Sequence, residues 1–379
     1  MRIGLDGLPL TEAKAGLGHY TYELATHLAG CAAHNDYDLI SPARLPSDLL
    51  DDVSLNFPEN LRVSTPKVNF LTRRWWSVGL PHYLYRHKVD LFHGTNFEVP
   101  LIGRCPTVVT IHDLSVLLHP QLQEPSAVRR AARRIPFAVQ QATAIITPTE
   151  SVRREVCEHL RVDPRKIFAV PLAARSCFRP LEFDETTETR RRLGVQDEFL
   201  LCVGTIEPRK NLPVLIAAFR DVLRHTELRP QLVLVGKKGW LVDELVHSFE
   251  DAELRSHLLW TNYISDADLQ ALYASCQAFI YPSLYEGFGL PLLEAMSCGA
   301  PVIANRIASL VEVTGVAARL VSAASVTDLA ESIVHLLRNK DERQALREKG
   351  LRHARHFSWE RTALSTHEVY RRVLSQQNR

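Results

Sequence analysis

Two glutamates in the second half of the chain are spaced so that they could bind the two ends of one ligand. Glu286 lies in a glycine-bounded loop after the expected strand Ala278–Tyr281, and Glu294 lies within the expected helix Leu290–Ser297. Eight helical residues span about 12 Å, and the distance grows where the loop is extended. Carboxylates at that separation could accept hydrogen bonds from hydroxyl groups at both ends of a molecule as long as a nucleotide sugar.

The segment between the two glutamates is suited to binding phosphate. Helix N-termini present backbone N–H groups to anions, and the amides concerned here belong to Phe288, Gly289 and Leu290. A nucleotide sugar carries its diphosphate between two sets of hydroxyl groups, so these amides lie where that diphosphate would bind. A carboxylate such as Glu294 on an otherwise apolar helix costs free energy if it is left unpaired, so we expect it to have a partner.

A pair of adjacent cations follows a strand-ending glycine. Gly204 comes directly after the expected strand Phe199–Val203, and Arg209 and Lys210 precede the expected helix Leu212–His225. Arginine offers a planar fork of donors and lysine a point charge, a combination that suits a diphosphate. An Arg-Lys pair can also be a solvated surface feature, and the sequence leaves that alternative open.

The first half of the chain offers two weaker signals. Gly16 and Gly18 form a glycine turn before a helix, where the backbone could approach an anion closely, although such turns are often only structural. His112 and Asp113 follow the expected strand Thr107–Ile111, at the strand end where α/β sheets bind ligands. A histidine that is simply buried and hydrogen-bonded is the alternative for His112.

Short β-branched runs alternate with longer segments of helical spacing, which predicts parallel sheets. The expected strands of the first half are Arg2–Leu5, Tyr37–Ile40, Asp90–His93, Thr107–Ile111, Ala144–Thr147 and Phe168–Val170. Those of the second half are Phe199–Val203, Gln231–Val235, Leu258–Trp260, Ala278–Tyr281, Pro301–Ala304 and Ala318–Val321. The expected crossover helices of the second half are Leu212–His225, Asp266–Ser275, Leu290–Ser297 and Val326–Asn339, with Asp266 and Thr327 as N-caps.

A chain of 379 residues exceeds what one core usually supports, so two domains are expected. The polar stretch Glu182–Arg192 is interpreted as a linker. We expect one α/β domain at residues 1–176, a second at 177–357 and a C-terminal helix at 358–379, capped by Ser358, that packs on the first domain. Open parallel sheets bind ligands beyond the carboxyl ends of their strands, so the two sheets are expected to face each other across an active-site cleft.

Composition restricts the function classes. A formal net charge of +2, 46% hydrophobic residues and 23% charged residues are typical of a soluble globular protein and argue against disorder or nucleic-acid binding. The charged N-terminus leaves no room for a signal peptide, and the longest apolar runs are strand-sized. Seven cysteines without Cys-x-x-Cys spacing argue against thiol chemistry. A cytoplasmic protein is expected.

These features together resemble glycosyltransferase family 4, the retaining enzymes of GT-B fold. The motifs that carry the resemblance are Glu286-x7-Glu294, Gly204 with Arg209-Lys210, the His112-Asp113 strand tip and the N-terminal glycine turn, in the family's order and spacing. The resemblance covers essentially the whole chain and is greatest to bacterial mannosyltransferases that build cell-surface polysaccharides. It implies two facing Rossmann-like domains, with the acceptor bound by residues 1–176 and the nucleotide sugar by residues 177–357.

The resemblance also implies a role for each matching residue. Glu286 would bind hydroxyl groups of the donor sugar, and Glu294 would bind the nucleotide ribose. Arg209 and Lys210 would neutralise the leaving diphosphate.

In the first domain, His112 would lie against the transferred sugar, while Gly16 and Gly18 would let their loop close over the phosphates. Two positions depart from the family pattern: His19 replaces a frequent Arg, and Val311 replaces a frequent Pro. The departure at His19 weakens the expectation that the glycine-turn loop contacts the acceptor or a phosphate. The departure at Val311 weakens the expectation for the loop beside the nucleotide.

The implied reaction uses no cofactor and no metal. The transition state of glycosyl transfer is oxocarbenium-like, and we expect same-face attack in which the departing phosphate oxygen helps take the acceptor's proton. Asp113 as a covalent nucleophile is the alternative. Asp266-Ala267-Asp268 matches a metal-binding Asp-x-Asp superficially, but acidic residues at a helix start complement the helix dipole.

The expected donor is GDP-mannose, with UDP-sugars as the alternative, and the expected acceptor is a glycan or a lipid-linked molecule. Three other functions remain open. One is a nucleotide-sugar epimerase of GT-B fold, and another is a non-catalytic nucleotide-sugar-binding protein. The third, a phosphorylase relative, would need a pyridoxal-phosphate lysine that the sequence does not reveal.

Basic and aromatic clusters in the net-positive first half predict reversible attachment to the inner face of a membrane. Arg73-Arg74-Trp75-Trp76 and Leu84-Tyr85-Arg86-His87-Lys88 interleave cations with aromatics, and Arg129, Arg130, Arg133 and Arg134 share one helix face. Each basic residue near an anionic leaflet contributes about 1 kcal/mol, and tryptophan favours the headgroup region. Alternatively, the tryptophans pack in the core and the arginines form a solvated helix face.

Overall fold

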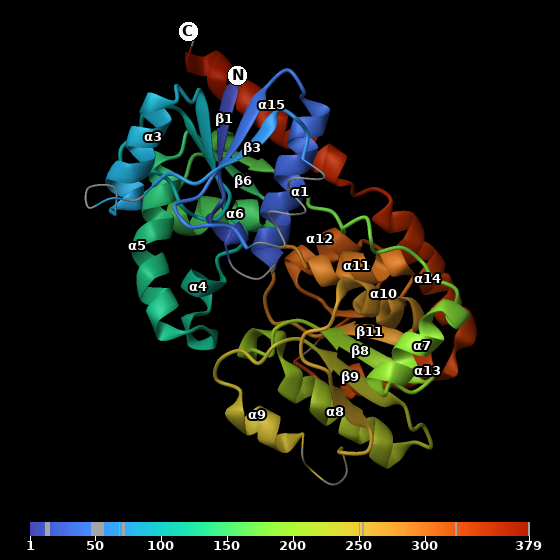
Figure 1. The fold of residues 1–379 in the computed structure, drawn as a ribbon. Helices are drawn as coiled ribbons and strands as arrows, with labels where there is room; N and C mark the ends of the chain where they lie inside the picture. The colour runs from blue at the N-terminus through green and yellow to red at the C-terminus, as the bar shows by residue number, and fades with distance from the viewer. Residues whose placement is uncertain are drawn as a thin grey trace. The chain divides into compact units, whose positions relative to one another are not determined.

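The computed structural model describes residues 1–11, 16–46, 57–67, 69, 73–249, 251, 254–322 and 324–377. The chain forms two compact units (Figure 1). Unit 1 comprises Met1–Leu117, Arg129–Leu172 and Ser358–Arg379, and unit 2 comprises Leu118–Val128 and Ala173–Phe357. The sequence places the boundary at residue 177; the structure groups residues from Ala173 onward with unit 2, and the short segment Leu118–Val128 as well.

Unit 1 contains a seven-stranded parallel sheet in the order β3-β2-β1-β4-β5-β6-β7. Its strands are β1 Arg2–Asp6, β2 Asp36–Ile40, β3 Leu61–Ser64, β4 Leu91–Gly94, β5 Thr107–Thr110, β6 Ala144–Thr147 and β7 Ile167–Ala169. Six of them lie within one residue of the predicted ranges. The sequence missed β3, because this edge strand has one buried residue out of four and therefore lacks a hydrophobic pattern.

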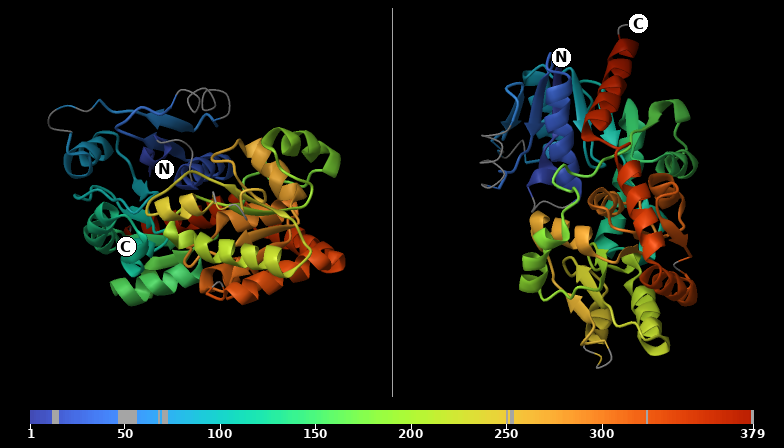
Figure 2. Two further views of the ribbon diagram at one scale, coloured as in Figure 1. Left: turned by 90° about the horizontal axis from the view of Figure 1, so that it is seen from below. Right: turned by 90° about the vertical axis from the view of Figure 1, so that its right-hand side faces the viewer.

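Helices cover the unit 1 sheet, and the last of them comes from the C-terminus. They are α1 Gly16–Cys31, α3 Leu80–Arg86, α4 Ser115–Leu118, α5 Pro125–Gln141, α6 Glu150–Leu160 and α15 Trp359–Gln377. Helix α15 packs alongside α1, as the right-hand view of Figure 2 shows. Ser358 Oγ accepts a hydrogen bond from the Arg361 amide at 3.2 Å, which confirms the predicted cap. Tyr370 Oη lies 2.6 Å from Nδ1 of the fully buried His93, so a polar contact also fixes this helix.

Unit 2 contains a six-stranded parallel sheet in the order β10-β9-β8-β11-β12-β13. Its strands are β8 Phe199–Val203, β9 Gln231–Val235, β10 Leu258–Trp260, β11 Ala278–Tyr281, β12 Val302–Asn305 and β13 Arg319–Val321. All six agree with the predicted ranges to within one residue. Strands buried on both faces form continuous apolar runs, which made them easy to predict.

The unit 2 helices show where local sequence signals mislead. They are α7 Phe183–Leu193, α8 Leu212–His225, α9 Asp243–Ser248, α10 Asp266–Ser275, α11 Leu290–Cys298, α12 Ala308–Thr314, α13 Val326–Arg338 and α14 Lys340–Ala354. The predicted N-caps Asp266 and Thr327 are wrong. The caps are Ser265 and Ser325, whose hydroxyl groups each accept an amide hydrogen bond at 3.1 Å. Each serine precedes the expected cap by one or two residues.

The predicted linker Glu182–Arg192 is instead largely helix α7. Glu182 begins it with a capping box that also uses Glu185, and Gly194 ends it. Among its residues whose burial is described, the fully buried positions are Thr186 and Arg190, one turn apart, so polar side chains occupy part of its inward face. The polar composition that suggested a linker therefore belongs to a helix packed against α10.

No helix within the described ranges is both long enough and apolar enough to cross a bilayer.

Candidate functional site

The predicted phosphate and sugar contacts of unit 2 meet at the carboxyl ends of two neighbouring strands. Strand β8 ends at Val203 and is followed by Gly204, and a short 3-10 turn at Pro208–Lys210 then presents both cations. Strand β11 pairs with β8 and leads into the loop that carries Glu286. Residues 76 positions apart in sequence are thus brought into direct contact.

Glu286 lies between the two predicted cations. Its Oε2 is 2.7 Å from Arg209 Nη1, and its Oε1 is 2.6 Å from Lys210 Nζ. Burial acts to raise the pKa of this carboxyl group, but Arg209 and Lys210 outweigh that effect and hold the pKa at about 2. Glu286 is therefore a buried carboxylate at neutral pH, ready to accept hydrogen bonds from a ligand's hydroxyl groups.

This cluster contains a second carboxylate that was not predicted from the sequence. Glu207 is buried, and its Oε1 lies 2.6 Å from Arg209 Nη2. Together Glu207 and Glu286 balance the charges of Arg209 and Lys210. A diphosphate that approached Arg209 would compete with carboxylates already in place. The available signal was position: Glu207 lies two residues before Arg209, in the same strand-end loop.

Gly204 makes room for Lys210. Its φ is +146°, and a Cβ built there would lie 3.0 Å from Lys210 Cε. The lysine Nζ also donates a hydrogen bond to Tyr281 Oη at 2.8 Å and lies 4.7 Å from the centroid of that ring. Glycine at this position therefore lets the lysine pass over the strand end toward Glu286.

The Glu286 loop is held by contacts from other strand ends. Ser309 Oγ donates a hydrogen bond to the Glu286 carbonyl at 2.6 Å, and Asn305 Nδ2 donates to the Ser283 carbonyl at 2.9 Å. The Leu284 amide donates to the Arg209 carbonyl at 2.9 Å. These bonds join the loop after β11 to the loops after β8 and β12, which fixes Glu286 relative to its cations.

Helix α11 begins beside this loop. Gly289 is its N-cap with φ +89°, a left-handed conformation that favours glycine, and Phe288 and Leu290 flank it. Amides of the first turn have no partner within their own helix, although Pro291 contributes none. Val311, one of the two departures from the family pattern, is partly exposed on α12.

Glu294 lies on α11 in a different electrostatic setting. Its Oε1 is 3.3 Å from Nε and Nη2 of Arg175, and Tyr273 Oη is 3.5 Å from its Oε2. Burial dominates and raises the pKa of this carboxyl group to about 7, although Arg175 opposes the rise. The expectation that Glu294 has a partner is thus met by Arg175, which the sequence analysis did not identify.

In unit 1, His112 is fixed by its neighbours. Its Nε2 donates to the Thr95 carbonyl at 2.8 Å, and the Tyr20 ring meets it edge-on with centroids 4.6 Å apart. Burial lowers the pKa of His112, which favours the neutral imidazole. Asp113 accepts a hydrogen bond from the Ser115 amide at 2.8 Å at the start of α4.

The two glycines of unit 1 lie in the first turn of α1 rather than in a turn before it. A Cβ at Gly18 would lie 3.0 Å from the Pro9 carbonyl oxygen, so a larger residue would push the two segments apart. Gly16 is exposed, and a Cβ there would meet nothing within 4 Å among the residues that the structure describes. Of these two glycines, Gly18 is therefore the one that close packing requires.

Comparison with known proteins identifies the family. Residues 185–353 match the family described as glycosyl transferases group 1, and residues 15–173 match the one described as glycosyltransferase family 4. The O-antigen chain mannosyltransferase B of Escherichia coli is 32% identical over 98% of this chain and 100% of its own length. The chain belongs to glycosyltransferase family 4. It is a glycosyltransferase.

A further curated relative and a solved structure are also similar to this chain. A D-inositol 3-phosphate glycosyltransferase of Corynebacterium glutamicum is 26% identical over 98% of this chain and 94% of its own length. The structure of Anabaena HepE in complex with UDP and glucose has a TM-score of 0.74 at 19% identity, and the match covers 97% of this chain and 98% of HepE. This likeness confirms the GT-B fold expected from the sequence.

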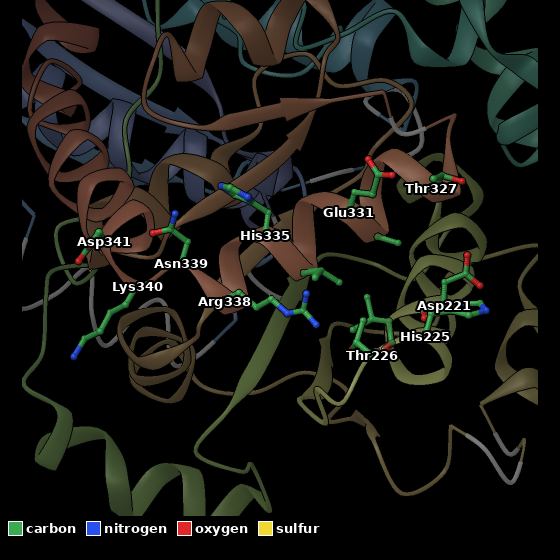
Figure 3. Close-up of a pocket in the computed structure, with 13 residues that line it drawn as sticks. Asp221, His225, Thr226, Thr327, Glu331, His335, Arg338, Asn339, Lys340 and Asp341 are labelled. Carbon is green, nitrogen blue, oxygen red and sulfur yellow. Dashed lines mark hydrogen bonds between the residues drawn. The ribbon is translucent and has the colours of Figure 1, made fainter.

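A cavity of about 870 Å³ lies elsewhere in unit 2, between α8 and α13 (Figure 3). Asp221 and His225 line it from α8, and Glu331, His335 and Arg338 line it from α13. It shares no residue with the site predicted from the family motifs. Its size alone therefore does not make it the donor site of this glycosyltransferase.

Proposed function

We propose that this family 4 enzyme is a retaining mannosyltransferase that moves mannose from GDP-mannose to a glycan or a lipid-linked acceptor. The observation that carries the chemistry is Glu286, held as a buried carboxylate by Arg209 and Lys210. Mannose is proposed as the transferred sugar because the chain is similar to the O-antigen chain mannosyltransferase B. A UDP-sugar donor is the alternative.

In the proposed reaction, the bond between the sugar's anomeric carbon and the diphosphate oxygen breaks, and its electron pair leaves with the nucleoside diphosphate. The acceptor hydroxyl attacks the anomeric carbon from the same face, and its proton passes to the departing phosphate oxygen. Arg209 and Lys210 stabilise the charge that develops on that leaving group. Glu286 accepts hydrogen bonds from hydroxyl groups of the sugar as it flattens toward the oxocarbenium-like state.

The remaining contacts are proposed on family likeness together with local geometry. Glu294 would bind the ribose hydroxyl groups, and the amides of Phe288, Gly289 and Leu290 would bind phosphate oxygens. In unit 1, His112 would contact a substrate as a neutral imidazole. Gly16 and Gly18 would allow the start of α1 to approach a phosphate, and the exposure of Gly16 supports that role.

We propose that the reaction needs no metal and no covalent intermediate on Asp113. Support comes from the contacts that the candidate acidic side chains already make within the protein. Asp266 and Asp268 form ion pairs with Arg175 and Arg192 at the start of α10, and Asp113 accepts the Ser115 amide. Activity that falls on treatment with EDTA and returns with a divalent cation would contradict the metal-free mechanism.

The test of the function is product analysis. The protein is incubated with GDP-mannose, GDP-glucose, UDP-glucose and UDP-N-acetylglucosamine, with and without a mannose-terminated acceptor, and products are analysed by mass spectrometry. We expect acceptor-dependent release of GDP and an α-linked product by NMR. Release of free sugar or an epimer without acceptor would favour an epimerase, and binding without turnover would favour a non-catalytic sensor.

We also propose reversible contact with an anionic membrane, through the expected basic surface but without the tryptophans. Trp75 is buried among apolar side chains and Trp76 packs against them, so the tryptophans do not supply the membrane contact. Among the described residues of unit 1, the exposed apolar side chains include Tyr85, Leu101 and Ile102. The guanidinium of Arg104 lies 5.7 Å from the centroid of the Tyr85 ring.

Helix α5 supports this proposal because Arg129, Arg130, Arg133 and Arg134 are all exposed, although Arg134 also pairs with Glu98. Co-sedimentation with anionic and neutral vesicles tests it. We expect binding that requires anionic lipid, weakens with salt and falls when the four arginines become Gln. Replacing the exposed Arg165 and Arg371 of the same unit is the control. Equal partitioning onto both vesicle types, or onto neither, would contradict it.

A further inference from the structure

Arg175 is a largely buried cation that the proposed chemistry does not use. It lies between β7 and α7, and its side chain is 12% exposed. Its guanidinium carbon is 4.7 Å from the centroid of the Phe178 ring. Burying an arginine is costly unless its charge is compensated, so its partners indicate why it lies there.

Those partners are two carboxylates on different helices. Nε and Nη2 both lie 3.3 Å from Glu294 Oε1 on α11, and Nη1 forms an ion pair with Asp266 on α10. The planar guanidinium thus bridges two helices, which a lysine ammonium cannot do with the same geometry. Because Arg175 contacts only one oxygen of Glu294, the second oxygen is left to Tyr273, whose Oη is 3.5 Å away.

The charge state of Glu294 depends on these neighbours. The titratable groups that face it are Arg175 and Cys177 on the segment before α7, Asp266 and Tyr273 on α10, and Cys298 on α11. Among them Arg175 is the cation that opposes the effect of burial on the Glu294 pKa, and Asp266 raises that pKa further. Loss of Arg175 would leave the carboxyl group protonated at neutral pH.

We propose that Arg175 is a positioning residue for nucleotide binding, which holds Glu294 in place as a carboxylate so that it accepts hydrogen bonds from the two hydroxyl groups of the nucleoside ribose. This inference rests on the proposed function, because it assumes that Glu294 binds ribose. A protonated Glu294 would offer a donor and a weaker acceptor to two hydroxyl donors. The arginine therefore acts through Glu294 and need not touch the nucleotide.

The inference predicts a ribose-specific and pH-dependent defect. Wild-type protein should bind GDP about tenfold more tightly than 2′,3′-dideoxy-GDP, which lacks both hydroxyl groups. Its GDP affinity should rise through about pH 7, where Glu294 loses its proton. In Arg175→Gln the preference for GDP should fall toward unity at pH 7, and the midpoint of the pH dependence should rise by at least one unit.

Isothermal titration calorimetry with both nucleotides from pH 6 to 9 provides the test. Asp266→Asn is the matched control, because it removes the other carboxylate of the bridge and leaves the Arg175–Glu294 pair. It should keep the GDP preference and lower the pH midpoint. A purely structural role for Arg175 would reduce binding of both nucleotides equally without moving the midpoint, and that result would overturn the inference.

Two further outcomes are distinguishable. If Arg175→Gln does not fold, Arg175→Lys, which retains the charge without the bridge, should reduce the GDP preference at least threefold, and an unchanged preference and midpoint would overturn the inference. If the wild type binds neither GDP nor UDP, the proposed function fails and this inference fails with it. If Arg175→Gln keeps the wild-type preference for GDP over 2′,3′-dideoxy-GDP, this inference fails while the proposed function stands.

Discussion

The surroundings of Glu286 and Glu294 differ, although the two residues lie eight positions apart and are both buried. Burial raises the pKa of each, but Glu286 has two cations within 2.7 Å and its pKa falls to about 2. Glu294 has one cation at 3.3 Å, shared with Asp266, and its pKa rises to about 7. The number and closeness of the cations, rather than depth in the protein, separates a fixed carboxylate from one that titrates near neutral pH.

The largest effect on activity should come from removing the two cations that contact Glu286. Arg209→Gln combined with Lys210→Met should lower kcat by about a thousandfold or more, because the leaving diphosphate loses both charges. Both Glu207 and Glu286 would also lose their partners, and Lys210 is buried, so stability should fall as well. Steady-state kinetics and circular dichroism measure the two effects.

Adding Glu286→Gln to that double variant serves as the control. It removes one uncompensated carboxylate and should recover part of the stability without recovering activity. Near-normal kcat in the folded double variant would show that the leaving group is stabilised elsewhere.

Gly204→Ala tests the contact between Lys210 and Glu286 through a steric change alone. The new Cβ would lie 3.0 Å from Lys210 Cε at φ +146°, so the lysine should be displaced from Glu286 and kcat should fall at least tenfold. Gly194→Ala is the matched control, since Gly194 also has a positive φ, +73°, but a Cβ there meets nothing within 4 Å. It should cost about 1 kcal/mol of stability and leave kcat unchanged. Equal kcat in both variants would contradict the role given to Gly204.

The two glutamates should also differ in the kinetic parameter that they affect. Glu286→Ala should mainly lower kcat, because its contacts with the sugar tighten in the transition state. Glu294→Ala should mainly weaken nucleotide binding, by about 1–3 kcal/mol for a lost charged hydrogen bond. Calorimetry with GDP and steady-state kinetics separate the two, and equal, unchanged GDP affinities in both variants would rule out this division of roles.

The opposite pKa directions predict opposite effects of pH on stability. Glu286, shifted from 4.5 to about 2, contributes stability that is fully present above about pH 4.5 and lost as pH falls toward 2. Glu294, raised from 4.5 to about 7, holds its proton longer in the folded state, so it reduces stability as pH rises from 4.5 to 7. Each pKa unit corresponds to about 1.4 kcal/mol.

Urea unfolding at pH 5 and pH 7.5 checks this contrast. Glu294→Gln should lose up to about 3 kcal/mol less stability between the two pH values than the wild type loses. Glu286→Gln should follow the wild-type pH dependence over this range, because Glu286 titrates below it. Parallel pH dependences for Glu294→Gln and the wild type would remove the distinction.

The contrast also indicates what could be predicted from the sequence. The buried strands were predicted closely because their apolar runs are local, whereas β3, α7 and α14 were missed because their described residues bury few large apolar side chains. Caps were misplaced by one or two residues because Ser265 and Asp266 are both acceptable cap residues and only geometry chooses between them.

In the site, Arg209, Lys210 and Glu286 were predicted from motifs in two separate loops, and the structure brings these three side chains into contact. The partner of Glu294 could not be predicted, since Arg175 lies 119 positions away in a segment without a motif. Trp75 was predicted to contact a membrane, but it is buried in a cluster with Leu80 and Phe92. This cluster forms only when the unit folds, so the sequence did not reveal the burial of Trp75.

The smallest effect on activity should come from removing a single serine hydroxyl group close to each glutamate. Ser309 Oγ donates to the Glu286 carbonyl at 2.6 Å, and Ser297 Oγ donates to the carbonyl of Leu293, the neighbour of Glu294, at 2.8 Å. Glu286 lies in a loop positioned by such tertiary bonds, whereas Glu294 is carried by the backbone of α11. Ser309→Ala should therefore lower kcat a few-fold and stability by about 1 kcal/mol, while Ser297→Ala should leave GDP affinity and kcat unchanged. Equal losses of kcat in the two variants would contradict the positioning role given to the Ser309 hydroxyl group.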